Sequence, residues 1–270
     1  MLNVHIKFSA VFVLAAFLVI GPAPAFSQNL LGFFRLPSGQ SFGALAIGNG
    51  PRYMGAAETV TVPVPVAQFQ SGPYTSRLVA NYLAVDLVET DAWAAGPSGL
   101  LRFGRSRSND PAVDSMQDIS WTIDLGGHLH RQWNRSDYQR YGAVGGSVLF
   151  DMGNVHGGWT ANANIMQFVP FGRFGTLGLA AGTHYGSGSF TQTYFGVSEA
   201  DAALSGLPVY TPGGGLRDVY VASVLIQPVS PEWAVGAGFL YSKLMGASAE
   251  SPIVAEQSQF YVGIGVMRVW

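Results

Sequence analysis

Cysteine is absent from this sequence, and charged residues are scarce. The lack of Cys in 270 residues excludes a disulfide framework, thiolate chemistry and thiolate metal sites. Charged residues make up 11%, against about 25% in typical soluble domains. The formal charge of −2 argues against a nucleic-acid partner, which requires a basic face. Glycine is abundant instead, with 35 residues, and hydrophobic residues reach 48%, a composition typical of a protein solvated partly by lipid.

Long apolar runs are also missing, apart from one at the N-terminus. Phe8 to Ile20 forms that run, and Ala25-Phe26-Ser27 follows it as a small-residue cleavage site. We therefore expect residues 1–27 to be a secretory signal peptide and residues 28–270 to form the mature protein. No later run approaches the roughly 18 apolar residues of a membrane-spanning helix. If the mature chain crosses a membrane, a closed β-barrel must do it, because every backbone group has to be paired in lipid.

Strict alternation of apolar and polar side chains is the main pattern that is present. In the last stretch, Phe260, Val262, Ile264 and Val266 share one face of a strand, opposite small or semi-polar residues. The stretch ends on an aromatic residue, Trp270, as the C-terminal signals of outer-membrane barrels do. A longer alternating stretch covers residues 118–133. A bulky row facing lipid and a polar row facing the lumen is the arrangement of a membrane barrel.

The alternating stretches number about eleven, and a barrel whose two ends both face the periplasm requires an even number. We predict an all-β, antiparallel, up-and-down transmembrane barrel of twelve strands, with ten as the alternative. Leu30 to Leu36 is a candidate for the missing strand, and Arg77 to Val88 is counted as a single strand. Pro63 and Pro65 remove hydrogen-bond donors from the stretch that contains them, which predicts an edge, a bulge or a strand end.

Turn lengths predict the orientation. Residues 170–173 and 228–232 are short connections, whereas residues 106–117 and 186–217 are long. Outer-membrane barrels place short turns in the periplasm and long loops outside. Counting back from a terminal strand that descends to the periplasm assigns both short turns to the periplasm and both long segments to the outside.

Candidate chemical sites are few. His128 and His130 share a predicted lumen face about 7 Å apart, with Asp124 on the same row. No third ligand at useful spacing accompanies them, so a polar lumen lining is the favoured interpretation over a metal site. His184 is also interpreted as lining, and His156 is placed in a turn. No catalytic motif occurs, so we expect no enzymatic activity, no cofactor and no metal.

Two stretches near the C-terminus carry ordered turn chemistry. Residues 193–218 contain aromatic residues, a predicted helical turn from Glu199 to Leu204 capped by Ser198, and a Pro/Gly-rich return. Residues 246–256 flank the same predicted hairpin on its other side. We expect the two to pack together as a cap over the outer mouth of the barrel. The residues expected to be buried there are Tyr194, Phe195, Leu207 and Tyr210.

These stretches and several shorter motifs closely resemble the MipA/OmpV family of outer-membrane proteins (MltA-interacting, scaffolding type). The motifs fall in the family's order across nearly the whole mature chain: Pro51-x-Tyr53-x-Gly55, Phe103-Gly104-Arg105, Asp118-Ile119, His156-Gly157, Thr193 to Ser198, Tyr241-Ser242-Lys243-Leu244 and Ser251-Pro252-Ile253-Val254.

The resemblance implies a non-catalytic barrel in the cell outer membrane of a Gram-negative-type envelope, in contact with its lipid. It implies a scaffold linked to murein synthesis and turnover, with a lytic transglycosylase and a murein synthase as partners, or a role in envelope integrity. A small-solute pore or a surface adhesin are the alternatives, and a barrel enzyme is less favoured. A murein partner must bind from the periplasmic side, through the short turns or the N-terminal segment. The resemblance names no site residue and no oligomeric state.

Overall fold

The computed structural model describes residues 40–106 and 108–270. The predicted signal segment, residues 1–27, and the candidate strand Leu30 to Leu36 lie outside these residues. The strands, in chain order, are β1 (Phe42–Pro51), β2 (Thr59–Ser71), β3 (Tyr74–Val79), β4 (Tyr82–Asp86), β5 (Val88–Glu89), β6 (Trp93–Arg102), β7 (Thr122–Trp133), β8 (Gly142–Asp151), β9 (Trp159–Phe171), β10 (Gly175–Gly186), β11 (Gly215–Pro228), β12 (Trp233–Leu244) and β13 (Ser258–Val269). The helices are α2 (Pro111–Asp114), α3 (Gly188–Phe195), α4 (Glu199–Ser205) and α5 (Gly246–Ala249). None of the helices in the described part of the chain is long and apolar enough to cross a membrane.

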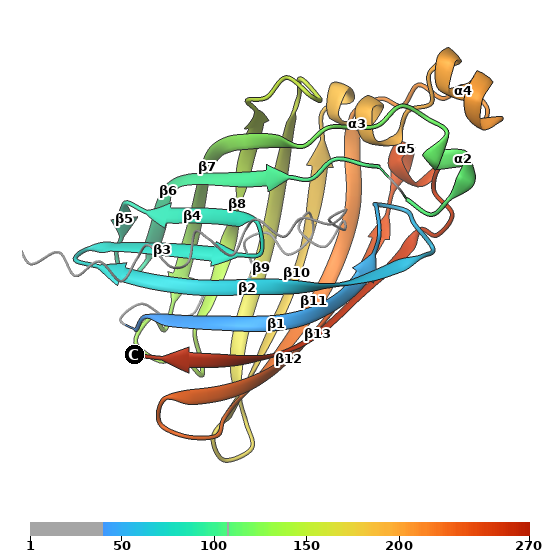
Figure 1. Ribbon diagram of the computed structural model, residues 1–270. Helices are drawn as coiled ribbons and strands as arrows, with labels where there is room; N and C mark the ends of the chain where they lie inside the picture. Colours follow the sequence, from blue (N-terminus) through green and yellow to red (C-terminus); the bar gives the residue numbers. More distant parts are fainter. Residues whose placement is uncertain (1–39, 107) are drawn as a thin grey trace, which may run out of the picture.

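The strands form one closed antiparallel sheet in which each strand pairs with its sequence neighbours, except that β4 pairs with β6 and not with β5 (Figure 1). β1 closes the barrel against β13, with Phe42 opposite Val269. β4 and β5 both pair with β6 on either side of Leu87, and so form one interrupted strand of the wall. The wall therefore has twelve strands, which confirms the predicted all-β up-and-down barrel and its strand number.

The strand missing from the sequence count lies within Arg77 to Val88, so the prediction of a single strand there was wrong. β3 and β4 form a tight hairpin whose turn residue, Ala80, takes a positive φ of 53°. This hairpin is short and pairs only with the periplasmic half of β2. Among the described residues, no strand covers the outer half of β2 on that side. Pro63 and Pro65 lie on this half, so the predicted edge is confirmed.

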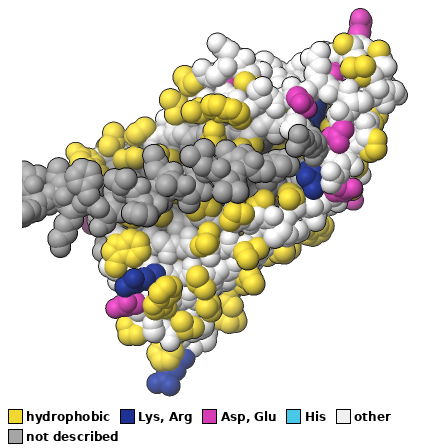
Figure 2. All heavy atoms as spheres, viewed as in Figure 1, with side chains coloured by type: hydrophobic (Ala, Val, Ile, Leu, Met, Phe, Trp, Pro, Cys, Tyr) yellow, Lys and Arg dark blue, Asp and Glu magenta, His cyan; other side chains and the backbone are white. Residues whose placement is uncertain are grey.

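The two rows of side chains on the terminal strand, β13, point outward and into the barrel as predicted. Ile264 on β13 is 68% exposed, whereas Tyr261 is 2% exposed. On β7 the apolar Leu125 and Leu129 point outward, and Thr122 and Asp124 point into the barrel. Figure 2 shows apolar side chains spread over the middle of the wall, with charged side chains near its two ends. This distribution matches a wall that faces lipid.

The inside of the barrel is crossed by a packed core. Val64 from β2 and Tyr141, just before β8, belong to the same cluster of buried side chains as Tyr220, Leu240 and Tyr261. These residues come from widely separated parts of the wall, so the cluster fills the lumen between them. A barrel of about this strand number has an interior that side chains can fill.

The four helices of the described residues gather at one end of the barrel, and the C-terminus lies at the other (Figure 1). The β9–β10 and β11–β12 turns are short and lie at the C-terminal end, where the amide of Val269 donates to the carbonyl of Glu232. All long connections lie at the helical end. The predicted orientation, with short turns in the periplasm and long loops outside, is consistent with this arrangement.

Candidate functional site

The histidine pair of β7 lies in the lumen as predicted, and His128 is paired with a carboxylate that the sequence analysis did not name. His128 and His130 are buried, with ring centroids 5.8 Å apart. His128 contacts Asp86 on β4 through Nε2 at 2.7 Å. Asp124 lies on the same face but does not share a carboxylate contact with them. It belongs to a second cluster nearer the outer mouth.

Three clusters of the same composition line the barrel interior, each with one Arg, one Asp and one His. Their members are Arg77, Asp86 and His128; Arg102, Asp124 and His156; and Arg217, Asp218 and His184. In each, the buried aspartate accepts from the guanidinium and contacts an imidazole nitrogen. Buried carboxylates persist only when they are paired and hydrogen-bonded, and these clusters supply both conditions.

The second cluster adjoins Asp151 at the outer end of β8. The Asp151 carboxylate accepts the hydroxyl of Thr122 at 2.5 Å and the amides of Gly153, His156 and Gly157 at 2.9, 2.7 and 2.8 Å. These bonds fix the β8–β9 turn, where Asn154 and Gly157 take positive φ values. The Asp151 carboxylate therefore holds the conformation of this turn.

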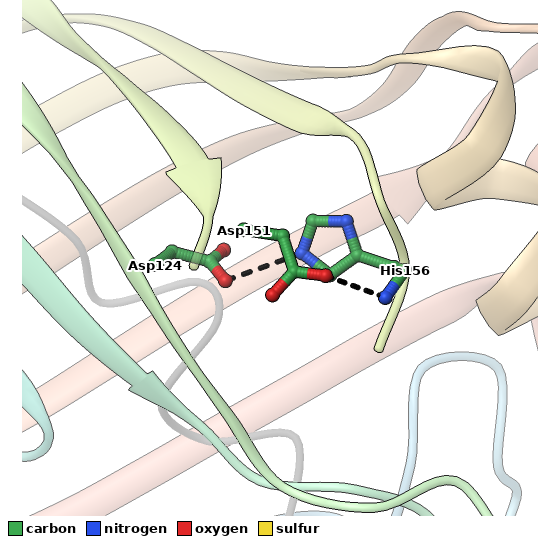
Figure 3. A group of neighbouring side chains, drawn as sticks. All are labelled: Asp124, Asp151 and His156. Atoms are coloured by element: carbon green, nitrogen blue, oxygen red, sulfur yellow. Dashed lines mark hydrogen bonds and ion pairs between the residues drawn. The ribbon is translucent and has the colours of Figure 1, made fainter. Parts of the chain in front are cut away.

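Asp124, Asp151 and His156 form the candidate metal group of the described residues (Figure 3). One ligand atom from each lies within 4.8 Å of the others. Protein donors already occupy these atoms, because Asp151 accepts four hydrogen bonds and Asp124 accepts two from Arg102. A guanidinium in direct contact also disfavours a second cation electrostatically. The group is therefore explained as a structural network.

α3 closes the outer mouth directly above this network. The ring of Phe190 is fully buried, with the Arg102 and Arg217 guanidinium carbons 4.9 and 5.9 Å from its centroid. The His156 ring meets it edge-on at 5.2 Å. Tyr194, one helical turn on, lies 4.8 Å from Phe190, and its carbonyl accepts a hydrogen bond from Arg105. The aromatic face of α3 thus rests on the cations of two lumen clusters.

The rest of the cap covers α3, and its two main segments pack together as the sequence predicted. The Tyr210 hydroxyl donates to the carbonyl of Ala247 at 2.8 Å, and the Ser251 hydroxyl donates to that of Phe195 at 2.5 Å. These two bonds join the segments 193–218 and 246–256. Tyr194 and Phe195 are buried as expected, and Leu207 and Tyr210 are half-buried.

Two further segments complete the cap. Tyr53 from the β1–β2 connection donates to the carbonyl of Ile253 at 3.2 Å. The amide of Gln117, beyond α2, donates to Asp201 of α4 at 2.8 Å. Burial alone would raise the pKa of Asp201, but hydrogen bonds from Gln117 and Ser198 hold it below its ordinary value. α4 is capped by Ser198, as predicted.

A family model for the MltA-interacting protein MipA matches residues 43–270. The chain belongs to the MipA family. The "Putative outer membrane protein YiaT" of Escherichia coli (strain K12) is 24% identical over 251 residues, which cover 89% of this chain and 97% of that protein. The outer membrane protein OmpV of Vibrio cholerae is 27% identical over 155 residues, covering 57% of each chain.

Solved structures similar to this MipA-family chain include a NanC porin, with a TM-score of 0.45 and 11% identity, covering 82% of this chain and 98% of the porin. The COG4313 outer membrane channel from Pseudomonas putida F1 has a TM-score of 0.43 and 14% identity, covering 89% and 98%. The MipA-family barrel described above is a protein of the outer membrane. The names of both relatives describe outer membrane proteins rather than enzymes.

Most partners of the lumen histidines were not predicted from the sequence. The inward rows of the strands also carry Arg77, Asp86 and Arg102. Opposite charges lie on neighbouring strands there, so the ion pairs could have been predicted once the strands were paired. α3 was missed because its helix is short and begins within a segment rich in Gly, Ser and Thr. Its N-cap, Ser187, accepting the amide of Phe190, is the local signal that was available.

Proposed function

We propose that this protein is a closed, non-catalytic outer-membrane scaffold that binds its partners at the membrane surface rather than passing solutes. The observation that carries the proposal is Phe190, buried between Arg102 and Arg217 where an open pore would need free space. The packed cluster around Tyr220 and Leu240 supports the same conclusion deeper in the lumen. The MltA-interacting description of the family supports a murein-linked partner, a lytic transglycosylase and through it a murein synthase.

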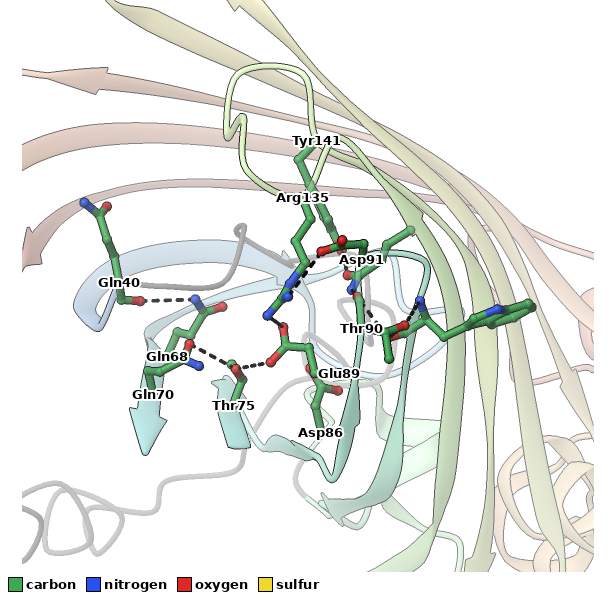
Figure 4. A network of polar contacts seen from close by, with 12 residues as sticks. Gln40, Gln68, Gln70, Thr75, Asp86, Glu89, Thr90, Asp91, Arg135 and Tyr141 are labelled. Carbon is green, nitrogen blue, oxygen red and sulfur yellow. Dashed lines mark hydrogen bonds and ion pairs between the residues drawn. The ribbon is translucent and has the colours of Figure 1, made fainter. Parts of the chain in front are cut away.

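Such partners work in the periplasm, so they would meet the short-turn end of the barrel. That rim is held by a polar network (Figure 4). Glu89 accepts the Thr75 hydroxyl at 2.6 Å and lies 3.5 Å from the Arg135 guanidinium, which also approaches Asp91 at 3.7 Å. Gln132 donates to the carbonyl of Thr90 at 2.6 Å. The network fixes the β5–β6 and β7–β8 turns relative to each other, so the rim presents a preformed docking surface.

Conductance in planar bilayers tests whether the barrel is closed. The wild-type protein should show no steady conductance. Phe190→Ala combined with Tyr194→Ala removes the rings that rest on the lumen arginines and should produce measurable openings. Deletion of Glu199–Ser205 is the matched control, because it shortens the cap but leaves Phe190 in place. Steady wild-type conductance would contradict the closed scaffold and favour the small-solute pore.

Binding to a purified MltA-type lytic transglycosylase tests the scaffold role. Arg140→Glu with Arg173→Glu reverses two charges on separate periplasmic turns and should weaken capture by tenfold or more, because rim charges steer and position a partner. Lys243→Glu, the same reversal at the outer end of β12, should leave capture unchanged. Failure of the wild-type barrel to capture the enzyme would refute the scaffold role. Equal loss with both variants would refute the periplasmic docking surface.

A further inference from the structure

An apolar cavity of about 140 Å³ lies inside the barrel beside the packed core. Its walls come from β1, β2 and β11–β13, and include Ala44, Val64, Val224, Leu240 and Tyr261. The lumen of a membrane barrel is ordinarily polar, so an apolar chamber within it needs an explanation. An apolar space of this size gives water few hydrogen-bond partners and can accept a small apolar molecule.

Two glycines on β12 leave this chamber open. A Cβ built on Gly236 would meet the Leu225 carbonyl oxygen at 3.4 Å, and one on Gly238 would meet the Ser223 carbonyl oxygen at 3.8 Å. Both are ordinary contact distances, and neither residue takes a positive φ. Close packing therefore does not require glycine at either position. The effect of the missing side chains is space inside the barrel.

A second cavity, of about 300 Å³, adjoins the first at the periplasmic end. The two share Phe42, Ile226 and Met267 as lining residues. The second cavity is polar on one side, and its wall includes Thr176, which is 2% exposed. The Thr176 hydroxyl has no hydrogen-bond partner among the described residues. A buried hydroxyl without a partner is costly, so a ligand that bonds to it gains affinity.

From these observations we propose that the lumen binds a small uncharged amphiphile that enters from the periplasmic side. Its apolar group, of about six carbons, occupies the chamber beside Gly238. Its polar head bonds to Thr176 in the second cavity, at the periplasmic end of the site. The charged residue on the cavity wall, Glu232, lies at the exposed rim beside Arg268, so no described residue of the cavity wall favours a charged head. This site is independent of the scaffold role, because it involves neither a protein partner nor conduction.

The test uses the mature barrel in lipid nanodiscs with ¹³C-methyl methionine and 1-hexanol as the probe. Saturable nuclear Overhauser contacts should appear between the hexyl protons and the Met267 methyl group. The Met166 methyl, buried elsewhere in the core, should show none. 1,6-Hexanediol, with the same chain and polar groups at both ends, should bind at least tenfold more weakly because burying its second hydroxyl is unfavourable.

Three variants decide between a specific site and partition into lipid. Gly238→Leu fills the chamber, so it should abolish the Met267 contacts while keeping or raising the unfolding midpoint. Ala163→Leu is its matched control, since it adds the same side chain to the exposed outer face of β9, whose residues line neither cavity, and should bind normally. Thr176→Val should weaken binding about fivefold, the value of one hydrogen bond. The proposal is overturned if no saturable contact appears at Met267, or if Gly238→Leu and Ala163→Leu bind alike.

Discussion

The ion pair of Arg102 and Asp124 should be the most sensitive point of the barrel interior. Arg102 donates to Asp124 through Nε at 2.8 Å and Nη2 at 2.5 Å, and both side chains are at most 1% exposed. Asp124→Asn keeps the shape of the side chain but leaves the guanidinium buried without a counter-charge. Removing one partner of a buried pair costs about 3–5 kcal/mol. The aromatic rings of α3 still face Arg102, so we expect the lower end, about 3 kcal/mol.

Removing both charges should cost much less than removing one. Arg102→Met with Asp124→Leu replaces the pair by apolar side chains of similar volume, which is commonly neutral or stabilising in buried sites. His156 would lose its contact with Asp124 but would still accept the amide of Gly158 at 3.1 Å. We therefore expect the double variant to lie within about 1 kcal/mol of wild type.

Reversible urea unfolding in phospholipid vesicles, followed by tryptophan fluorescence and by gel mobility of the folded barrel, gives these free energies. The double-mutant cycle also requires the single variants Arg102→Met and Asp124→Leu. Arg102→Met leaves Asp124 buried beside His156 without its guanidinium partner. Additive costs of Arg102→Met and Asp124→Leu in the double variant, or a cost below about 0.5 kcal/mol for Asp124→Asn, would contradict a tightly coupled buried pair.

Three other predictions concern the lipid face, the cap and the metal group. Leu129→Arg, in the middle of β7, should lower the unfolding free energy by about 2–4 kcal/mol. Leu216→Arg, at the outer end of β11, should lower it by about 0–1 kcal/mol. Equal losses in the same urea assay would show that the depths of these two residues in the membrane are misassigned. The folded pKa of Asp201 lies below its ordinary value, so its contribution to cap stability is present above pH about 4 and is lost as pH falls further. Asp201→Asn should thus speed protease cleavage of the cap at pH 7 with no difference from wild type in strong acid, and an equal rate at pH 7 would contradict this. Added Zn²⁺ or a chelator should leave the unfolding midpoint unchanged; a Zn²⁺-dependent rise that His156→Ala removes would show that the acidic group binds metal.

Much of the barrel could be predicted because lipid imposes a simple rule on each strand. The outward rows of β7 and β13 must be apolar wherever they meet hydrocarbon, so alternation identified both faces correctly. The cap was predictable for a similar reason, since Tyr194 and Phe195 carry more apolar surface than a solvated loop tolerates. The β3–β4 hairpin was not predictable in this way. Its turn at Ala80 and Asn81 lacks Gly and Pro, so alternation runs through it without an obvious interruption.

Strand periodicity alone does not predict the lumen clusters. Arg217 and Asp218 are consecutive, so strict alternation places them on opposite faces of β11. Both are nevertheless buried inside, because the pairing of β10 with β11 shifts register between His184 and Tyr185. That bulge turns the extra residue inward and brings the Arg217 guanidinium within 2.6 Å of the carboxylate that His184 also contacts. The cluster that supports Phe190 from one side therefore depends on a local irregularity of pairing. Such an irregularity is set by contacts between strands, and no pattern within either strand specifies it.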